Sequence, residues 1–327
     1  MVDEKQLQDA VKKTVSRNDV KYVVGYKKGT YGSQVTPCFA YEPEDSEEFI
    51  FSPFCVHNLA VFPMLEEKPP LRRGQEPDDR KIGLVVKGCD SRAIVQIIQE
   101  KGLERDKVVI IGIPCTGVID PKKFKEMFPE TKENVEIKDE DDNFVIKIDG
   151  KTKRVPKDEL MPDKCLTCQY PTPLIYDILI GKEIKPSRKQ NYKDIEKYEK
   201  MSLKEKWEFW EEQFSKCIRC YACRNACPLC YCKECFVDQL DPQWVRRTVD
   251  VSENTAWNLI RAYHLAGRCI GCGQCERVCP MDIPLMKLNK KIEKDVKELF
   301  DYIAGIDVEK KPLLAMFKPD DPEEFIL

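Results

Sequence analysis

Two cysteine motifs of identical spacing constrain this 327-residue chain more than any other feature. In each motif three cysteines are separated by two residues, and a fourth follows after three residues and precedes a proline. A loop with two-residue gaps can wrap three iron corners of a cubane, and the cysteine before proline reaches the other cluster. We therefore predict two [4Fe–4S] clusters. One uses Cys217, Cys220, Cys223 and Cys279, and the other uses Cys269, Cys272, Cys275 and Cys227.

The alternative to a cubane is structural zinc. Zinc sites commonly use two CxxC pairs separated by a longer loop, whereas here four cysteines fall within eleven residues, twice. Eleven of the seventeen cysteines lie between Cys217 and Cys279. The N-terminus shows no apolar leader, so we expect a cytoplasmic protein, in which clustered cysteines indicate metal rather than disulfides.

Further cysteines leave a third metal site open. Cys230, Cys232 and Cys235 lie between the two motifs and could hold three corners of another cluster, with a fourth ligand from Cys165 or Cys168. Alternatively, the three shield the neighbouring clusters or are small buried hydrophobes. Cys165 and Cys168 could equally bind zinc with another pair of ligands.

The N-terminal part of the chain reads as α/β. Residues 81–86 and 108–113 are short apolar runs typical of buried strands, and 91–98 has helical periodicity with Asp90 or Ser91 placed to cap it. This is a βαβ unit of a parallel sheet. Two alternating segments, 135–138 and 144–148, predict a hairpin insertion. The expected divisions are an α/β domain (1–180), a charged helical linker (181–215), a small α-helical dicluster ferredoxin domain (216–290), and a helix with an extended tail (291–327).

The loops after the two buried strands are where an α/β sheet binds ligands. The first, 87–92, opens a helix whose N-terminus favours phosphate, and the second is 114–117. No GxGxxG follows a strand, which argues against a Rossmann nicotinamide site. The glycines of these loops could also serve only to make tight turns.

Several short segments resemble a known family. They are Lys87-Gly88-Cys89-Asp90-Ser91-Arg92-Ala93, Gly112-Ile113-Pro114-Cys115-Thr116-Gly117, Cys165-Leu166-Thr167-Cys168 and 53–61. The sequence is similar to the beta-subunit family of F420-reducing hydrogenases and dehydrogenases, in the branch with a C-terminal dicluster ferredoxin domain. The family's best-known members place their cluster motifs before the flavin domain, whereas this chain places them after it.

The resemblance implies an electron-transfer subunit that binds FAD and [4Fe–4S] clusters and takes coenzyme F420 as a substrate. It also implies a catalytic partner of the formate dehydrogenase, hydrogenase or heterodisulfide reductase kind, with ferredoxin or similar carriers open as further partners. The residues then expected to contact flavin are Lys87, Gly88, Cys89, Asp90, Ser91, Arg92, Pro114, Cys115, Thr116 and Gly117.

Composition and missing motifs limit the other functions. A formal net charge of −3 offers no basic field for nucleic acid, and no apolar run is long enough to span a membrane. There is no GxSxG, HExxH or P-loop sequence, so we assign no catalytic residue. Trp207, Trp210 and Phe214 stand at helical spacing and are expected to form a core stripe. A flavin-free electron conduit that docks a catalytic partner remains the alternative to a flavin-containing one.

Overall fold

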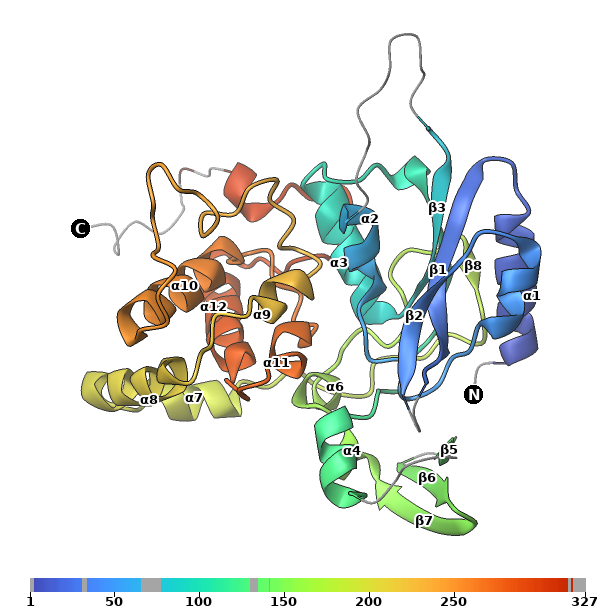
Figure 1. The fold of residues 1–327 in the computed structure, drawn as a ribbon, viewed down its shortest axis with the longest axis horizontal. Helices are drawn as coiled ribbons and strands as arrows, with labels where there is room; N and C mark the ends of the chain where they lie inside the picture. The colour runs from blue at the N-terminus through green and yellow to red at the C-terminus, as the bar shows by residue number, and fades with distance from the viewer. Residues whose placement is uncertain are drawn as a thin grey trace. The chain divides into compact units, whose positions relative to one another are not determined.

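The structure is a computed structural model, and it describes residues 3–30, 34–65, 78–129, 135–140, 142–316 and residue 319. The predicted C-terminal tail therefore lies largely outside the described residues. The chain divides into two compact units, the first comprising 1–94 and 101–190 and the second 95–100 and 191–327. Figure 1 shows the arrangement of the elements within each. No helix among the described residues is long and apolar enough to cross a membrane.

The first unit is built on a five-stranded sheet of order β2-β1-β3-β4-β8. Strands β1, β3, β4 and β8 are parallel, with β8 at one edge of the sheet, and β2 runs antiparallel to β1 at the other edge. The strands are β1 (Val20–Lys28), β2 (Val35–Ala40), β3 (Lys81–Val86), β4 (Val108–Gly112) and β8 (Ile178–Leu179). The α/β class and the parallel β3–α3–β4 unit predicted from the sequence are confirmed.

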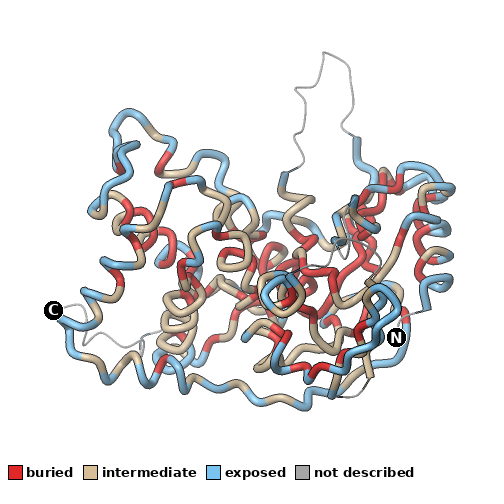
Figure 2. The backbone as a smooth tube through the Cα atoms, turned by 60° about the horizontal axis from the view of Figure 1, so that its bottom comes forward, coloured by how far each residue is buried: buried red, intermediate tan, exposed pale blue. Residues whose placement is uncertain are grey.

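Helices complete the first unit. They are α1 (Glu4–Val15), α2 (Phe62–Leu65), α3 (Gly88–Gln99), α4 (Pro121–Met127), α5 (Lys157–Leu160) and α6 (Asp163–Leu166). The residues of α3 from Val95 onward are counted with the second unit. α1 buries Leu7 and Val11 and packs against β1, β3 and β4. Every residue of β4 is buried, as expected for a parallel strand covered on both faces. Figure 2 marks such buried positions in red.

α3 begins three residues earlier than the sequence pattern suggested. It starts at Gly88, so Asp90 lies inside its first turn instead of capping it from outside. The Asp90 carboxylate accepts a hydrogen bond from the backbone N–H of Lys87 at 2.9 Å. Asp90, a residue within the helix, therefore caps the backbone N–H of the residue that precedes the helix.

A small antiparallel sheet, β5-β6-β7, lies within the first unit. β5 (Val135–Glu140) pairs with β6 (Asn143–Ile148), in the region where a hairpin was predicted, and β7 (Lys151–Pro156) adds a third strand. The sequence pattern does not predict β7. All but one of its residues are exposed, so it has no alternation of apolar residues to mark it.

The second unit is helical. Its helices are α7 (Lys193–Glu199), α8 (Leu203–Ser215), α9 (Ala222–Asn225), α10 (Val251–His264), α11 (Gln274–Arg277) and α12 (Leu285–Phe300). Ser202 and Glu205 form a capping box at the start of α8. On α8, Trp210 and Phe214 are buried as expected, whereas Trp207 is 57% exposed and does not belong to the core. The indole of Trp207 lies on the outer face of the helix.

Candidate iron–sulfur and cysteine sites

The two cysteine motifs adopt the same backbone conformation. Arg219 and Gly271 occupy matching positions and have φ values of 56° and 67°, while Tyr221 and Gly273 have 57° and 67°. Glycine adopts the left-handed region freely, but an L-residue there costs roughly 1–2 kcal/mol. Arg219 is held in place by hydrogen bonds to the Tyr221 hydroxyl and to the carbonyls of Glu253 and Arg246. The second motif obtains the same turn from glycine.

Each motif then enters a one-turn helix, α9 in the first and α11 in the second, and these two helices contact each other. The fourth cysteine of each motif, Cys227 or Cys279, follows directly after its helix. This contact brings the end of one motif to the loop of the other, as the crossed ligand pattern requires.

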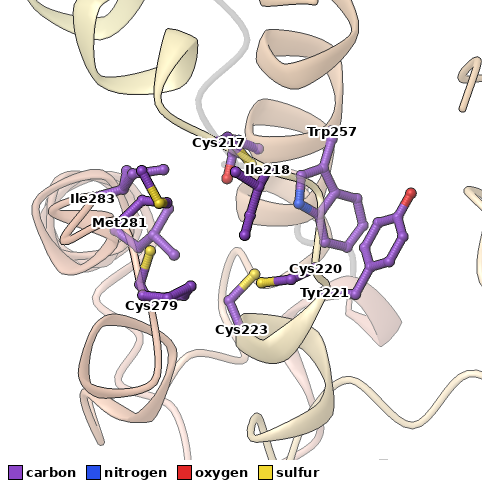
Figure 3. A pocket seen from close by; sticks show the side chains of 12 residues that line it. Cys217, Ile218, Cys220, Tyr221, Cys223, Trp257, Cys279, Met281 and Ile283 are labelled. Atoms are coloured by element: carbon purple, nitrogen blue, oxygen red, sulfur yellow. The ribbon is translucent and has the colours of Figure 1, made fainter. Parts of the chain in front are cut away.

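A cavity lies between the motifs. Its cysteines are Cys217, Cys220 and Cys223 of the first motif and Cys279 of the second. Figure 3 shows these four side chains around one space, with Trp257, Met281 and Ile283 beside them. Four thiols around an otherwise mainly apolar cavity fit the requirements of a cubane with cysteine ligands.

The remaining four predicted ligands are also electrostatic neighbours. Besides the larger effect of burial, Cys227 and Cys272 raise the pKa of Cys275, and Cys272 and Cys275 raise the pKa of Cys269. Burial raises the pKa of Cys275 to about 12 and the pKa of Cys269 well above its usual value. Because thiolates are the metal-binding form, filling this site would release protons.

Cys227 differs from its neighbours in acidity. A hydrogen bond with Cys230 outweighs burial and lowers the pKa of Cys227 to about 6, whereas that bond together with burial raises the pKa of Cys230. Cys235 interacts with Arg224 through a side-chain hydrogen bond and packs near Val237, Val245 and Trp257. Cys232 is exposed.

The side-chain arrangement bears on the zinc alternative. Within the described ranges, no three His, Cys, Asp or Glu side chains converge closely enough to hold a single metal ion. Thiols spread around a cavity suit a cluster of several metal atoms, whose iron corners each take one ligand. The cavity lined by four cysteines therefore suits the cubane that the spacing predicts.

In the first unit, the residues predicted to contact flavin lie mostly in the interior. Lys87 is 2% exposed and Asp90 is fully buried, and their charged atoms are 2.9 Å apart. The Lys87 ammonium also donates to the carbonyl of His57 at 2.9 Å and contacts the hydroxyl of Tyr26. Although burial alone would lower the pKa of Lys87, the Asp90 carboxylate raises it well above its usual value.

The remaining residues of these loops are held by the segment around residues 170–174. The hydroxyl of Ser91 donates to the Gly88 carbonyl at 2.8 Å and accepts from the backbone N–H of Leu174 at 2.9 Å. A Cβ at Gly88 would lie 1.7 Å from the carbonyl oxygen of Tyr170, and Arg92 stacks on the Tyr170 ring. The backbone N–H of Cys115 donates to the Pro171 carbonyl at 2.8 Å.

These contacts do not fit direct flavin binding by Lys87, Asp90 or Ser91, because each is at most 2% exposed and is bonded to protein groups. Pro114 is also buried, whereas Cys89, Cys115, Thr116 and Gly117 are partly exposed. Thr116 bonds to Asp139, and Gly117 has a φ of +135° beside the Met161 sulfur.

The structure brings together cysteines of the first unit that the sequence analysis treated separately. Besides the larger effect of burial, Cys165 and Cys168 raise the pKa of Cys115, and Cys115 raises the pKa of Cys89. Burial raises the pKa of Cys115 to about 12. Arg188 anchors this region by donating to the carbonyls of Cys165 and Thr116. The sequence signal for the group was the placement of Cys89 and Cys115 directly after two adjacent parallel strands.

Comparison with known proteins agrees with both parts of the chain. Residues 79–235 match the family model of the C-terminal region of the coenzyme F420 hydrogenase/dehydrogenase beta subunit, and residues 216–284 match a 4Fe-4S dicluster domain. The clusters, electron transfer and oxidoreductase class expected from the sequence are thus supported. A chain of the F420-reducing [NiFe] hydrogenase complex from Methanosarcina barkeri aligns at a TM-score of 0.39 and 15% identity, over 66% of this chain and 91% of that one.

Two curated relatives extend the match. The F420-dependent formate dehydrogenase subunit beta of Methanocaldococcus jannaschii is 28% identical, covering 72% of this chain and 76% of the relative. The F420-dependent formate dehydrogenase 1 subunit beta of Methanococcus maripaludis is 30% identical with the same coverage. On these matches the chain belongs to the beta-subunit family of coenzyme F420 hydrogenases and dehydrogenases and carries a 4Fe-4S dicluster domain.

Proposed function

We propose that this chain is the electron-transferring beta subunit of an F420-dependent complex of the formate dehydrogenase kind. The relatives named above carry that activity in their descriptions. The observation that carries the proposal is the cavity ringed by three cysteines of one motif and one of the other. Two cubanes in this arrangement pass single electrons, and their potentials are set by burial, nearby charge and hydrogen bonds to sulfur.

Each cluster has a definite ligand set in this proposal. The first is held by Cys217, Cys220, Cys223 and Cys279, and the second by Cys269, Cys272, Cys275 and Cys227. Replacing Cys227 with alanine should therefore damage the second cluster, although Cys227 belongs to the first motif in sequence. Electron paramagnetic resonance of the dithionite-reduced protein tests this assignment. Loss of the first cluster with the second intact would contradict it.

A third metal site is proposed for the first unit, in place of one shared by Cys230, Cys232 and Cys235 with Cys165 or Cys168. Its candidate ligands are Cys89, Cys115, Cys165 and Cys168, supported by their mutual electrostatic influence. Iron and acid-labile sulfide distinguish two clusters from three, because each cubane contributes four of each atom. Cys168→Ser should lower the iron content by about four atoms per chain if the site is a cubane.

Flavin is the remaining part of the proposal, and it separates two versions of the function. About one FAD per chain in anaerobically purified protein, with F420-dependent dye reduction, would support a flavin-containing subunit in which flavin divides an electron pair for the clusters. A brown, folded, flavin-free protein would support the alternative, an iron–sulfur conduit that docks a catalytic partner of the formate dehydrogenase or hydrogenase kind. A colourless protein free of iron would contradict both versions.

A further inference from the structure

Helix α10 directs a polar stripe toward the cysteine loops. Asn254, Asn258 and Arg261 follow one another at helical spacing, and each is at most 4% exposed. Asn254 donates to the carbonyls of Phe214 and Cys217 at 3.0 and 2.9 Å. A helix packed only for its apolar core would not present such residues inward. The stripe therefore belongs to the structure that surrounds the cysteine loops.

Arg261 is the charged member of this stripe. It is 4% exposed, and its Nη2 donates to the Cys223 carbonyl at 3.0 Å. Its Nε is buried without a hydrogen-bond partner, and none of the ion pairs found among the described residues includes Arg261. A buried guanidinium that lacks a carboxylate partner is costly, so its retention requires another source of negative charge.

The same cysteines, as thiolates bound to a cluster, would supply that negative charge. Those that act most strongly on Arg261 are Cys275 and Cys227, followed by Cys230 and Cys223. Cys275 and Cys227 both belong to the proposed ligand set of the second cluster. The amide of Asn289, which is 3% exposed, lies 3.6 Å from the Cys275 sulfur as a hydrogen-bond donor. Two independent groups thus favour negative charge at the same ligand.

Reduction adds one electron and therefore one negative charge to a cubane. Burial of Cys272 and Cys275 would by itself make the second cluster harder to reduce, because a low-dielectric site disfavours the added charge. A fixed positive charge and hydrogen bonds to sulfur act in the opposite direction. Arg261 and Asn289 are placed to offset the effect of burial.

We infer that Arg261 is a positioning residue that sets the reduction potential of the second cluster, with Asn289 as a weaker contributor. This inference rests on the proposed function, since it requires both clusters. In a medium of effective dielectric constant about 20, removal of a buried unit charge beside a cluster changes a one-electron equilibrium roughly tenfold or more. Tenfold corresponds to 59 mV for a one-electron couple.

The test is a redox titration of the full chain, purified with its clusters and followed by electron paramagnetic resonance. The step of the second cluster is identified by its absence in Cys272→Ser. Arg261→Gln should lower that midpoint by about 59 mV while the iron content stays at the wild-type value. Arg261→Lys keeps the charge and should restore most of the midpoint. Lys204→Gln, which removes the same charge at a side chain that is 83% exposed, is the matched control.

Three results would overturn the role of Arg261: a shift no larger than that of Lys204→Gln, an equal shift in Arg261→Lys, or a shift confined to the other cluster. If Arg261→Gln fails to retain its clusters, Arg261→Lys and Asn289→Leu decide the matter. The inference then requires a near wild-type midpoint in the first and a smaller negative shift in the second. Absence of iron from the wild-type chain would overturn the proposed function as well, so the two failures are distinguishable.

Discussion

The buried pair of Lys87 and Asp90 should be a major source of stability in the first unit. Its charged atoms are 2.9 Å apart, with side-chain exposures of 2% and 0%. Asp90→Asn would leave the ammonium buried without a counter-charge, and breaking one side of such a pair typically costs about 3–5 kcal/mol. Lys87 would retain the His57 carbonyl and the Tyr26 hydroxyl as acceptors. We therefore expect the lower end, about 3 kcal/mol.

Hydrogen exchange followed by mass spectrometry is the suitable assay, because the four tryptophans at 207, 210, 244 and 257 all lie in the second unit. A loss of about 3 kcal/mol should speed exchange in β3 and the start of α3 roughly 150-fold where opening is at equilibrium. The exposed pair of Lys147 and Glu136, with side chains 48% and 67% exposed, gives the control. Lys147→Met should cost no more than about 1 kcal/mol.

A double-mutant cycle shows whether the effect belongs to the pair. If Lys87→Met and Asp90→Asn are coupled, the double variant should be clearly more stable than the sum of the two single losses implies. Strictly additive losses, or a single Asp90→Asn loss below about 1 kcal/mol, would refute the claim that this ion pair stabilises the interior.

Three further predictions concern packing, the first cysteine loop and pH. Gly88→Ala should destabilise the first unit by about 2–3 kcal/mol in urea unfolding, because the new Cβ would meet the Tyr170 carbonyl; a change below about 0.5 kcal/mol would contradict that close approach. Asn254→Leu removes the donor to the Cys217 carbonyl and should speed cluster loss under air, measured by decay of the visible absorbance; an unchanged decay rate would count against it. Burial raises the pKa of Glu100, but the interactions with Arg268 and Tyr231 lower it by a larger amount. The net result is a pKa below the usual value. Glu100 therefore stabilises the fold above its usual pKa and loses this effect as the pH falls below about 4.5, so the melting temperature of Glu100→Gln should vary less than that of wild type between about pH 3 and 6.

Sequence patterns predicted the parts of the fold that are formed by continuous apolar runs or by apolar residues at helical spacing. β3, α3 and β4 are almost entirely buried, so their apolar runs were readable. β1 was not predicted, although it carries five consecutive buried residues. β8 has only two residues, too few for any periodic signal. The start of α3 was misplaced because Gly88 is a poor helix former, and the reason it occurs there is the Tyr170 carbonyl, which comes from a distant segment.

The cysteine spacing predicted which thiols gather, because a cubane fixes the number of residues between the cysteine ligands of one loop. The spacing could not reveal the charges around those thiols. In sequence, Arg261 reads as the polar face of an amphipathic helix, since arginine is rarely fully buried. Only the structure shows that this face turns inward, where the Cys223 carbonyl and the neighbouring thiols take the place of water. If those thiols hold clusters, the arginine that is costly in the empty chain becomes a favourable partner in the loaded one, so cluster binding should stabilise the second unit beyond the metal–sulfur bonds themselves.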